Sequence, residues 1–282
     1  MNSVISLVKL ALEEDLGVNC QLNGDLTGQL IDEALEASAI VVAKSPGVVS
    51  GFLYFEKSFE ILDRHVEIKW YCDEGSEVEV GKIICEVRGN ARVLLAAERT
   101  ALNFLQTLSG TATFTKRVRQ KFANSKILLL DTRKTIPGLR FAQKKAVNVS
   151  GGHNHRSGLF DMILIKENHI AAIGSIKEAV FRAKKLYPKI KTEVEVRNVD
   201  EFIEAQDTAA DIIMLDNFKI VDIRKVTKLN VSHKLLEVSG GITLDNLDKY
   251  LDLKIDYLSM GELTKQVIPL DLSMLIKYEK NI

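Results

Sequence analysis

The chain has 282 residues, of which 46% are hydrophobic, and its 38 basic residues balance its 38 acidic residues. This length and apolar content allow a sizeable buried core, in either one barrel-sized domain or two smaller domains. The zero net charge argues against a nucleic-acid partner, because binding to a phosphate backbone needs a broad excess of Lys and Arg.

The cysteines and the hydropathy pattern bear on the compartment. Cys20, Cys72 and Cys85 are an odd number without a CxxC pair, which fits neither a disulfide framework nor a four-thiolate zinc site. No apolar run approaches the roughly 18 to 20 residues of a membrane span, and the N-terminus lacks the pattern of a signal peptide. We therefore expect a cytoplasmic protein with reduced thiols and no membrane contact.

The first part of the chain mixes helical and extended patterns, as expected of a small α/β domain. Helical spacing covers residues 3–16, 52–62 and 91–108, and a second helix at 111–122 is predicted after Gly110. A loop runs to Thr27. Extended patterns cover 37–44, 47–50 and 66–71, followed by a β-rich segment at 75–89.

The second part repeats one unit, in which a short apolar strand and a polar turn precede an amphipathic helix. The predicted strands are 127–130, 162–165, 193–196, 212–215, 235–238 and 257–259, and the predicted helices are 176–187, 199–205, 220–228 and 244–251. This alternation predicts a parallel sheet covered by helices. Six units, with 146–149 as a possible further strand, favour a closed or nearly closed α/β barrel. A doubly wound open sheet is the alternative, although the chain lacks the GxGxxG and Walker A sequences.

Positive charge is concentrated between Asp131 and Ile170. The basic residues of this stretch are Arg133, Lys134, Arg140, Lys144, Lys145, Arg156 and Lys166, against only Asp131, Asp161 and Glu167. Such an imbalance predicts a pocket for a small polyanion, because concentrated positive charge attracts anionic ligands. The alternative is a solvated basic face.

Polar residues and glycines follow the predicted strands, at the ends that face one mouth in a barrel. They are Asp131, Thr132, Arg133, Lys134, Lys166, Glu195, Asp216, the turn Ser239-Gly240-Gly241 and the turn Met260-Gly261-Glu262. Glycine turns let backbone N–H groups approach a phosphate, although they can also serve as tight turns only. Glu195 and Asp216 suit Mg²⁺, although either could instead neutralise Lys134 or Lys166. Together these residues predict a site for a phosphorylated substrate chelated by magnesium.

No nucleophile is evident in the sequence. The serines and cysteines lack a nucleophile elbow, and the histidines lack HExxH spacing. His153, His155 and Arg156 are too closely spaced to ligate one metal together, so His155 and Arg156 are predicted to bind an anion instead. Glu98 and Arg99 are adjacent in a mostly apolar helix, and from this pattern alone they are interpreted as exposed surface residues or as a structural ion pair. The pattern favours catalysis by positioning and electrostatics.

At these residues the sequence closely resembles the quinolinate phosphoribosyltransferases, also called carboxylating nicotinate-nucleotide pyrophosphorylases. The resemblance covers nearly the whole chain, through the motifs ALEEDLG, GDLT, AAERTALNFLQTLSG, DTRKTIPGLR, GGHNHRSGL, LIKENHI, EVEV, IIMLDNF, LEVSGGIT and LTK. It implies an N-terminal α/β sandwich domain at 1–110, joined by the C-terminal tail 270–282, and an incomplete α/β barrel at 111–269. It also implies a homodimer in which the partner's N-terminal domain completes each barrel mouth.

The resemblance further implies the reaction of quinolinate with phosphoribosyl pyrophosphate to give nicotinate mononucleotide, pyrophosphate and CO₂. It places Arg133, His155 and Arg156 on the quinolinate carboxylates, with Arg99 donated by the other subunit. Lys134 and Lys166 would lie near the reacting centre, with Glu195 and Asp216 at the ribose hydroxyls and Mg²⁺. The turns 239–241 and 260–262 would hold the 5-phosphate.

Ser150 departs from the family pattern, which usually has glycine there. The nearest alternative is a related pyrophosphorylase-like protein associated with molybdate transport, although the LIKENHI motif of residues 164–170 is intact here. A second alternative is a catalytically inactive barrel that acts as a binding module. The complete set of Arg, Lys, Glu and Asp at the strand ends argues against it.

Overall fold

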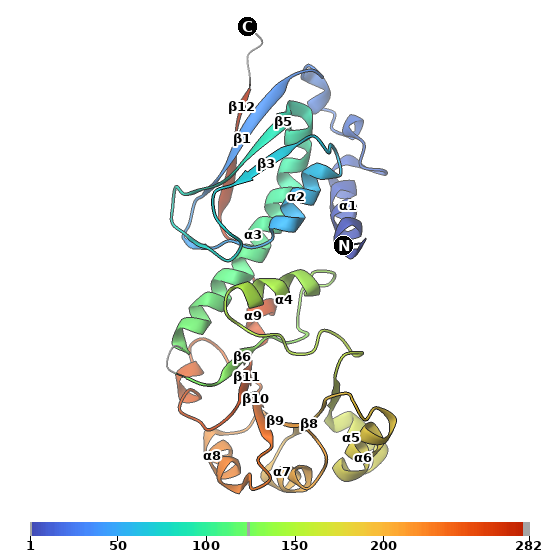
Figure 1. The fold of residues 1–282 in the computed structure, drawn as a ribbon, viewed down its shortest axis with the longest axis vertical. Coiled ribbons are helices and arrows are strands. Elements are labelled where there is room, and N and C mark those ends of the chain that lie inside the picture. Colours follow the sequence, from blue (N-terminus) through green and yellow to red (C-terminus); the bar gives the residue numbers. More distant parts are fainter. Residues whose placement is uncertain (1, 123–124, 279–282) are drawn as a thin grey trace. The chain divides into compact units, whose positions relative to one another are not determined.

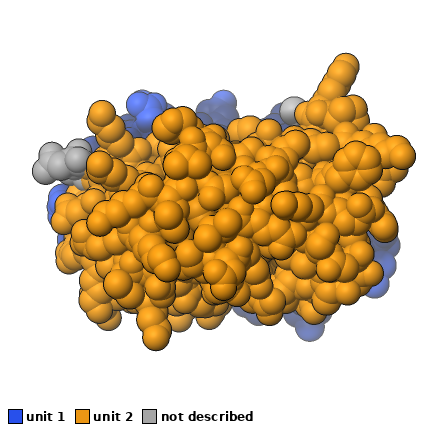
Figure 2. Space-filling view, turned by 90° about the horizontal axis from the view of Figure 1, so that it is seen from below, with its two compact units in different colours: residues 1–114, 267–282 blue, residues 115–266 orange. Residues whose placement is uncertain are grey.

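The computed structural model describes residues 2–122 and 125–278, and the chain divides into two compact units (Figure 2). Unit 1 comprises Met1–Phe114 and Val267–Ile282, and unit 2 comprises Thr115–Gln266. The boundaries expected from the sequence, 110/111 and 269/270, lie within a few residues of this division. Residues 279–282 of the expected C-terminal tail lie outside the described residues.

Unit 1 is built on a four-stranded antiparallel sheet in the order β12-β1-β5-β3 (Figure 1). Its strands are β1 (Glu36–Ala43), β3 (Glu67–Trp70), β5 (Ile83–Asn90) and β12 (Leu272–Tyr278). The short strands β2 (Gly47–Val48) and β4 (Glu77–Val78) form a separate pair. The helices are α1 (Asn2–Leu16), α2 (Phe52–Glu60) and the first part of α3 (Ala91–Lys121), and two 3₁₀ turns, η1 (Leu22–Gly24) and η2 (Gly28–Leu30), follow α1.

Alternation along β1 explains the core of unit 1. Every second residue from Ala37 to Ala43 is buried, because successive side chains of a strand point to opposite faces of the sheet. That face packs against Phe55 and Phe59 of α2 and against Leu94 of α3, within one cluster of buried residues. Helices on one face of an antiparallel sheet give the α/β layer predicted from the sequence.

Gly110 does not separate two helices, so the prediction of a break there was wrong. Helix α3 continues through Gly110 to Lys121. A Cβ at Gly110 would lie 2.2 Å from the backbone oxygen of Ile268. This close approach of two backbone segments requires glycine at position 110. In the sequence, a glycine required for this reason cannot be told from a glycine that ends a helix.

Unit 2 contains six parallel strands in the order β6-β11-β10-β9-β8-β7. They are β6 (Leu128–Leu130), β7 (Ile163–Ile165), β8 (Thr192–Val196), β9 (Ile212–Asp216), β10 (Leu235–Ser239) and β11 (Tyr257–Ser259). Strands β7 to β11 follow one another in chain order, and the first strand, β6, lies beside the last, β11. This singly wound order is that of an incomplete barrel, whereas a doubly wound sheet reverses its order at a switch point. The barrel prediction is confirmed.

The described helices of unit 2 are α4 (Arg140–Val149), α5 (Glu167–Ile173), α6 (Ile176–Leu186), α7 (Val199–Gln206), α8 (Ile220–Leu229) and α9 (Glu262–Lys265). Helices α6, α7 and α8 confirm the helices predicted at 176–187, 199–205 and 220–228, whereas α4, α5 and α9 were not predicted. Residues 146–149 belong to α4, so their assignment as a possible strand was wrong. The helix predicted at 244–251 is reduced to a 3₁₀ turn, η3 (Leu247–Lys249). The side chain of Asn246 bonds the backbone at Thr243 and Gly241, which favours a local turn over a helix.

Within the described ranges, no helix has both the length and the apolar character needed to cross a membrane.

Candidate active site

A cavity of about 640 Å³ opens at the carboxyl ends of the parallel strands of unit 2. Eleven of the residues predicted from the sequence line it: Thr132, Arg133, Lys134, His155, Arg156, Lys166, Glu195, Asp216, Ser239, Gly240 and Gly241. The other lining residues are Leu164, Glu167, Arg197, Met214, Asn217, Glu237 and Ser259. Because parallel strands end at one edge, residues far apart in the sequence meet in this cavity.

Four predicted residues are not in the cavity lining. Met260 is fully buried, and its backbone N–H donates to the oxygen of Leu130. Gly261 lies beside the side chain of Lys134, because a Cβ added at Gly261 would be 3.0 Å from the Cδ atom of Lys134. Glu262 accepts a hydrogen bond from the backbone of Leu244. Arg99 belongs to α3 within unit 1, and its side chain is exposed.

A buried ion pair anchors the turn that carries His155 and Arg156. Asp131 follows β6, and its carboxylate Oδ1 accepts hydrogen bonds from the ammonium group of Lys144 on α4 and from the backbone N–H of His155. The same ammonium group donates to the backbone oxygen of His155 at 2.9 Å. Burial raises the pKa of Asp131 to about 6, although Lys144 opposes the shift. Ser150, at the end of α4, has φ −99°, a conformation that any residue adopts.

Two arginines face the same region of the cavity. Burial lowers the pKa of Arg156, and the positive charge of Arg133 lowers it further. The Nε atom of Arg133 is buried without a hydrogen-bond partner among the described residues. Neighbouring guanidinium groups with unused donors favour a ligand with carboxylate or phosphate groups, which they can bind through paired hydrogen bonds.

A second ion pair lies at the carboxyl ends of β7 and β8. The ammonium group of Lys166, which follows β7, lies 2.5 Å from Oε2 of Glu195 on β8. Burial raises the pKa of Glu195, Lys166 opposes this shift, and the charge of Asp216 adds to it. Glu195 and Asp216 are therefore close enough to interact, and both line the cavity.

The turn after β10 has a backbone that only glycine accommodates. Gly240 has φ +97°, and a Cβ there would lie 2.3 Å from Oδ1 of Asn217. Asn217 itself has φ +56°, donates its backbone N–H to Ser239, and donates from Nδ2 to Asp216. The turn is therefore held against the residue that follows β9, which orients the carboxylate of Asp216.

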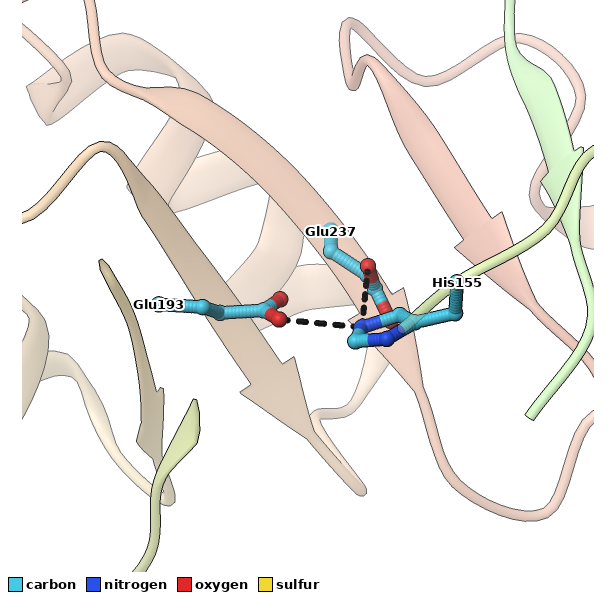
Figure 3. Close-up of side chains that lie close together, drawn as sticks. All are labelled: His155, Glu193 and Glu237. Carbon is cyan, nitrogen blue, oxygen red and sulfur yellow. Dashed lines mark hydrogen bonds and ion pairs between the residues drawn. The ribbon is translucent and has the colours of Figure 1, made fainter. Parts of the chain in front are cut away.

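His155 lies between two buried glutamates (Figure 3). Its Nε2 is 2.9 Å from Oε2 of Glu193 and 3.4 Å from Oε2 of Glu237. Its Nδ1 accepts the backbone N–H of Arg156 at 2.7 Å. Burial lowers the pKa of His155, but the contacts and charges of the two glutamates outweigh it and raise that pKa. This shift favours a cationic ring, whereas a second proton, on Nδ1, would meet the N–H of Arg156 at 2.7 Å. The hydrogen bond to Arg156 therefore decides for the neutral ring with its proton on Nε2, because protonation of Nδ1 would break it.

Sequence reasoning missed Glu193, Glu237, Asn217, Arg197 and Ser259. One signal was available for Glu193, because the strand sequence TEVEV places it on the same face as Glu195. No sequence signal indicated that Glu237, within the apolar strand β10, would reach His155.

A singly wound α/β barrel with arginines, lysines, acids and a glycine turn around one mouth suits the binding of a polyanionic small molecule. Comparison with known proteins specifies the family. The protein-family model named quinolinate phosphoribosyl transferase, C-terminal domain, matches residues 111–275. The family model for the N-terminal domain matches residues 25–109. The chain belongs to the quinolinate phosphoribosyltransferase family.

Curated relatives and solved structures agree with this assignment. The chain is 40% identical over 262 residues to a probable nicotinate-nucleotide pyrophosphorylase (carboxylating) of Bacillus subtilis, which covers 93% of this chain and 89% of the relative. It is 37% identical to the chloroplastic enzyme of that name from Arabidopsis thaliana, over 97% of this chain and 83% of the relative. The nicotinate-nucleotide pyrophosphorylase structure from Francisella tularensis superposes with a TM-score of 0.92 at 40% identity, covering 98% of this chain and 96% of that chain. Nothing in these matches favours the alternative associated with molybdate transport.

The buried pair yields a prediction about stability. Replacing Lys144 with methionine leaves the carboxylate of Asp131 buried without its counter-charge, which lowers the free energy of unfolding by about 3–5 kcal/mol. The double variant Asp131→Asn/Lys144→Met removes both charges and loses less than the single variant. Urea denaturation measures both.

Lys121→Met is the control, because Lys121 pairs with Asp248 on the surface. Loss of that exposed pair costs about 1 kcal/mol or less. Equal losses for Lys121→Met and Lys144→Met would contradict the role given to the buried pair.

Proposed function

We propose that this chain transfers the phosphoribosyl group of phosphoribosyl pyrophosphate to quinolinate, releasing pyrophosphate and CO₂ and forming nicotinate mononucleotide. The observation that carries the proposal is the single cavity in which Arg133 and Arg156 face Glu195 and Asp216, in a chain of the quinolinate phosphoribosyltransferase family. The three free cysteines, Cys20, Cys72 and Cys85, support a cytoplasmic location for this reaction.

Arg133 and Arg156 are proposed to bind the two carboxylates of quinolinate. The unused Nε donor of Arg133 and the mutual repulsion of the two guanidinium groups support this assignment, because a dianion relieves both. His155 lines the same wall. Since both of its ring nitrogens already have partners within the protein, the hydrogen bonds to the substrate carboxylates come from the guanidinium groups.

The phosphoribosyl end is proposed to lie along Ser239, Gly240 and Gly241, with Met260, Gly261 and Glu262 forming the adjacent turn. Gly240 and Gly241 have φ +97° and +59° and carry no Cβ to obstruct a phosphate. Thr132 and Lys134 lie on the same side, since Gly261 contacts Lys134.

Glu195 and Asp216 fit Mg²⁺, which binds one or two carboxylates together with substrate phosphates. Both carboxylates line the cavity, and they lie close enough for the charge of Asp216 to raise the pKa of Glu195. When bound, Mg²⁺ would neutralise the pyrophosphate leaving group. Lys166, now paired with Glu195, would then be available to the substrate.

The chain's own residues act by orientation and charge. Arg133 and Arg156 hold the pyridine nitrogen towards C1 of the ribose, and that nitrogen forms the new bond as the bond from C1 to the pyrophosphate oxygen breaks. Lys134 and Lys166 stabilise the negative charge that develops on the leaving oxygen. The positive pyridinium ring then accepts the electron pair left by the departing CO₂, and a proton replaces that carboxylate. This route needs no protein nucleophile.

The active enzyme is proposed to be a homodimer in which Arg99 reaches the partner's cavity. Arg99 is exposed on α3. Unit 2 also exposes large apolar side chains next to one another in sequence, with Leu159 73% and Phe160 83% exposed. Exposed apolar side chains of this size are typical of surfaces that contact another protein.

Substrate choice tests the proposed function directly. We expect nicotinate mononucleotide to form from quinolinate, phosphoribosyl pyrophosphate and Mg²⁺, measured by chromatography. Nicotinate in place of quinolinate should be used at least about a hundredfold less well, because an arginine left without its carboxylate costs about 2–5 kcal/mol. Equal use of the two acids, or no product from quinolinate, refutes the proposal.

Removal of the metal tests the acid pair. A chelator should abolish activity, and Mg²⁺ or Mn²⁺ should restore it, because oxygen ligands suit both ions. Glu195→Gln should raise the KM for phosphoribosyl pyrophosphate and leave quinolinate binding, measured by calorimetry, nearly unchanged. Glu178→Gln, at an exposed acid on α6, is the control. The opposite pattern, in which quinolinate binding is lost and the KM for phosphoribosyl pyrophosphate is unchanged, would show that Glu195 contacts quinolinate and would refute this assignment.

Subunit mixing tests the shared site. Arg99→Ala and Lys134→Ala homodimers should each be nearly inactive. After reversible dissociation of an equal mixture, half the dimers are hybrids with one intact site, so roughly a quarter of wild-type activity should return. Native mass spectrometry verifies the exchange.

The reciprocal mixture is the control. Wild-type chains mixed equally with the double variant Arg99→Ala/Lys134→Ala should fall from about half to about a quarter of full activity, because each hybrid site carries one defect. If exchange occurs and neither change is seen, Arg99 serves its own subunit.

A further inference from the structure

Two glutamates below the cavity have no role in the reaction described above. Glu193 on β8 and Glu237 on β10 are both fully buried, and Figure 3 shows their carboxylates directed towards the ring of His155. Glu237 lines the cavity but Glu193 does not. The side chain of Glu193 reaches the cavity wall through its hydrogen bond with His155, and it lies near enough to Glu237 for the charge of that acid to raise its pKa.

Stability does not explain these acids. Oε1 of Glu193 and Oε1 of Glu237 are buried without a hydrogen-bond partner in the described part of the chain, and Oε2 of Glu237 has only its long contact of 3.4 Å with Nε2 of His155. Unsatisfied buried carboxylate oxygens are costly, and apolar side chains of similar volume often serve a barrel interior as well or better. Buried polar groups that are not fully paired occur at functional sites, where position matters more than stability.

The contacts of His155 show what the acids can fix. With Nδ1 accepting the N–H of Arg156 at 2.7 Å, the proton of the neutral ring is on Nε2, where it is donated to Glu193 at 2.9 Å. A metal ion at this cluster would need the lone pair on Nε2, which that proton occupies. An acceptor at position 193 thus selects the tautomer that can hold the backbone of Arg156.

We propose that Glu193 is a positioning residue for quinolinate: by accepting the Nε2 proton of His155, it orients Nδ1 to hold the backbone of Arg156 and so fixes the guanidinium group at the cavity wall. Glu237 supports the same ring from the neighbouring side. This inference rests on the proposed function, because it concerns the carboxylate subsite. Its chemical requirement is a hydrogen-bond acceptor at position 193 rather than a negative charge.

Two substitutions at position 193 separate these requirements. Glu193→Gln keeps an acceptor oxygen, whereas Glu193→Met keeps a similar shape without one. We expect Glu193→Met to bind quinolinate roughly tenfold to hundredfold more weakly by calorimetry, as for the loss of a charge-assisted hydrogen bond. Glu193→Gln should stay within about threefold of wild type, a range too small to represent a lost hydrogen bond. The KM for phosphoribosyl pyrophosphate should be unchanged in both variants.

A double-mutant cycle shows whether Glu193 acts through His155. In the His155→Ala background, adding Glu193→Met should cause no further loss of quinolinate binding, because the contact it disrupts is already gone. A general packing defect would add to the loss instead. Thr192→Val, at the buried neighbouring position of β8, is the control for disturbance of the strand and should bind quinolinate as wild type does.

Each outcome decides between stated alternatives. If the wild-type chain does not bind quinolinate, the proposed function fails and the inference fails with it. If wild type binds and Glu193→Met binds equally well, only the inference fails. If Glu193→Gln is as weak as Glu193→Met, charge rather than an acceptor is required, and the positioning mechanism is overturned. Additive losses in the double variant overturn it as well.

Discussion

The buried ion pair between Asp131 and Lys144 is the interaction on which the cavity depends. It joins the end of β6, helix α4 and the backbone of His155, three segments that the chain order separates. A buried pair of this kind adds little net stability compared with apolar side chains of the same volume. Its effect is on position, because the turn it holds carries both His155 and Arg156. The arginine therefore has a defined place before any anion arrives.

The sequence predicted the barrel well because most of its parallel strands are short, largely apolar runs with buried residues. Strand β8, TEVEV, is fully buried although two glutamates interrupt its apolar residues. The errors of the sequence prediction arose where contacts outside the hydrophobic pattern decided the local structure, one contact being distant in the chain and the other local. Gly110 has the pattern of a helix end, yet the backbone at Ile268 requires glycine there within one continuous helix. Residues 244–251 have helical spacing, yet Asn246 forms a side-chain turn in the same segment.

The residues of the candidate site also divide into those that could be predicted from the sequence and those that could not. Residues that follow strands, such as Lys166 and Asp216, could be predicted, because the carboxyl ends of a parallel sheet meet at one edge. Glu193 had one signal, its place on the same strand face as Glu195, but nothing in the sequence indicated that Glu193 or Glu237 would meet His155. Their meeting with His155 depends on the segment after α4, which returns beside β6, where His153 pairs with Leu130. That return is a property of the folded backbone alone.

The sheet of unit 1 also has a consequence for the order of folding during synthesis. Its edge strand β12 comes from residues 272–278, whereas its neighbour β1 comes from residues 36–43. A ribosome translates the whole of unit 2 between them, so the nascent chain carries β1 with one unpaired edge until residues 272–278 have been made. Unpaired strand edges recruit other chains. Growing copies on one messenger are therefore exposed to mispairing while unit 2 is translated, and the arrival of β12 is what pairs this edge of β1.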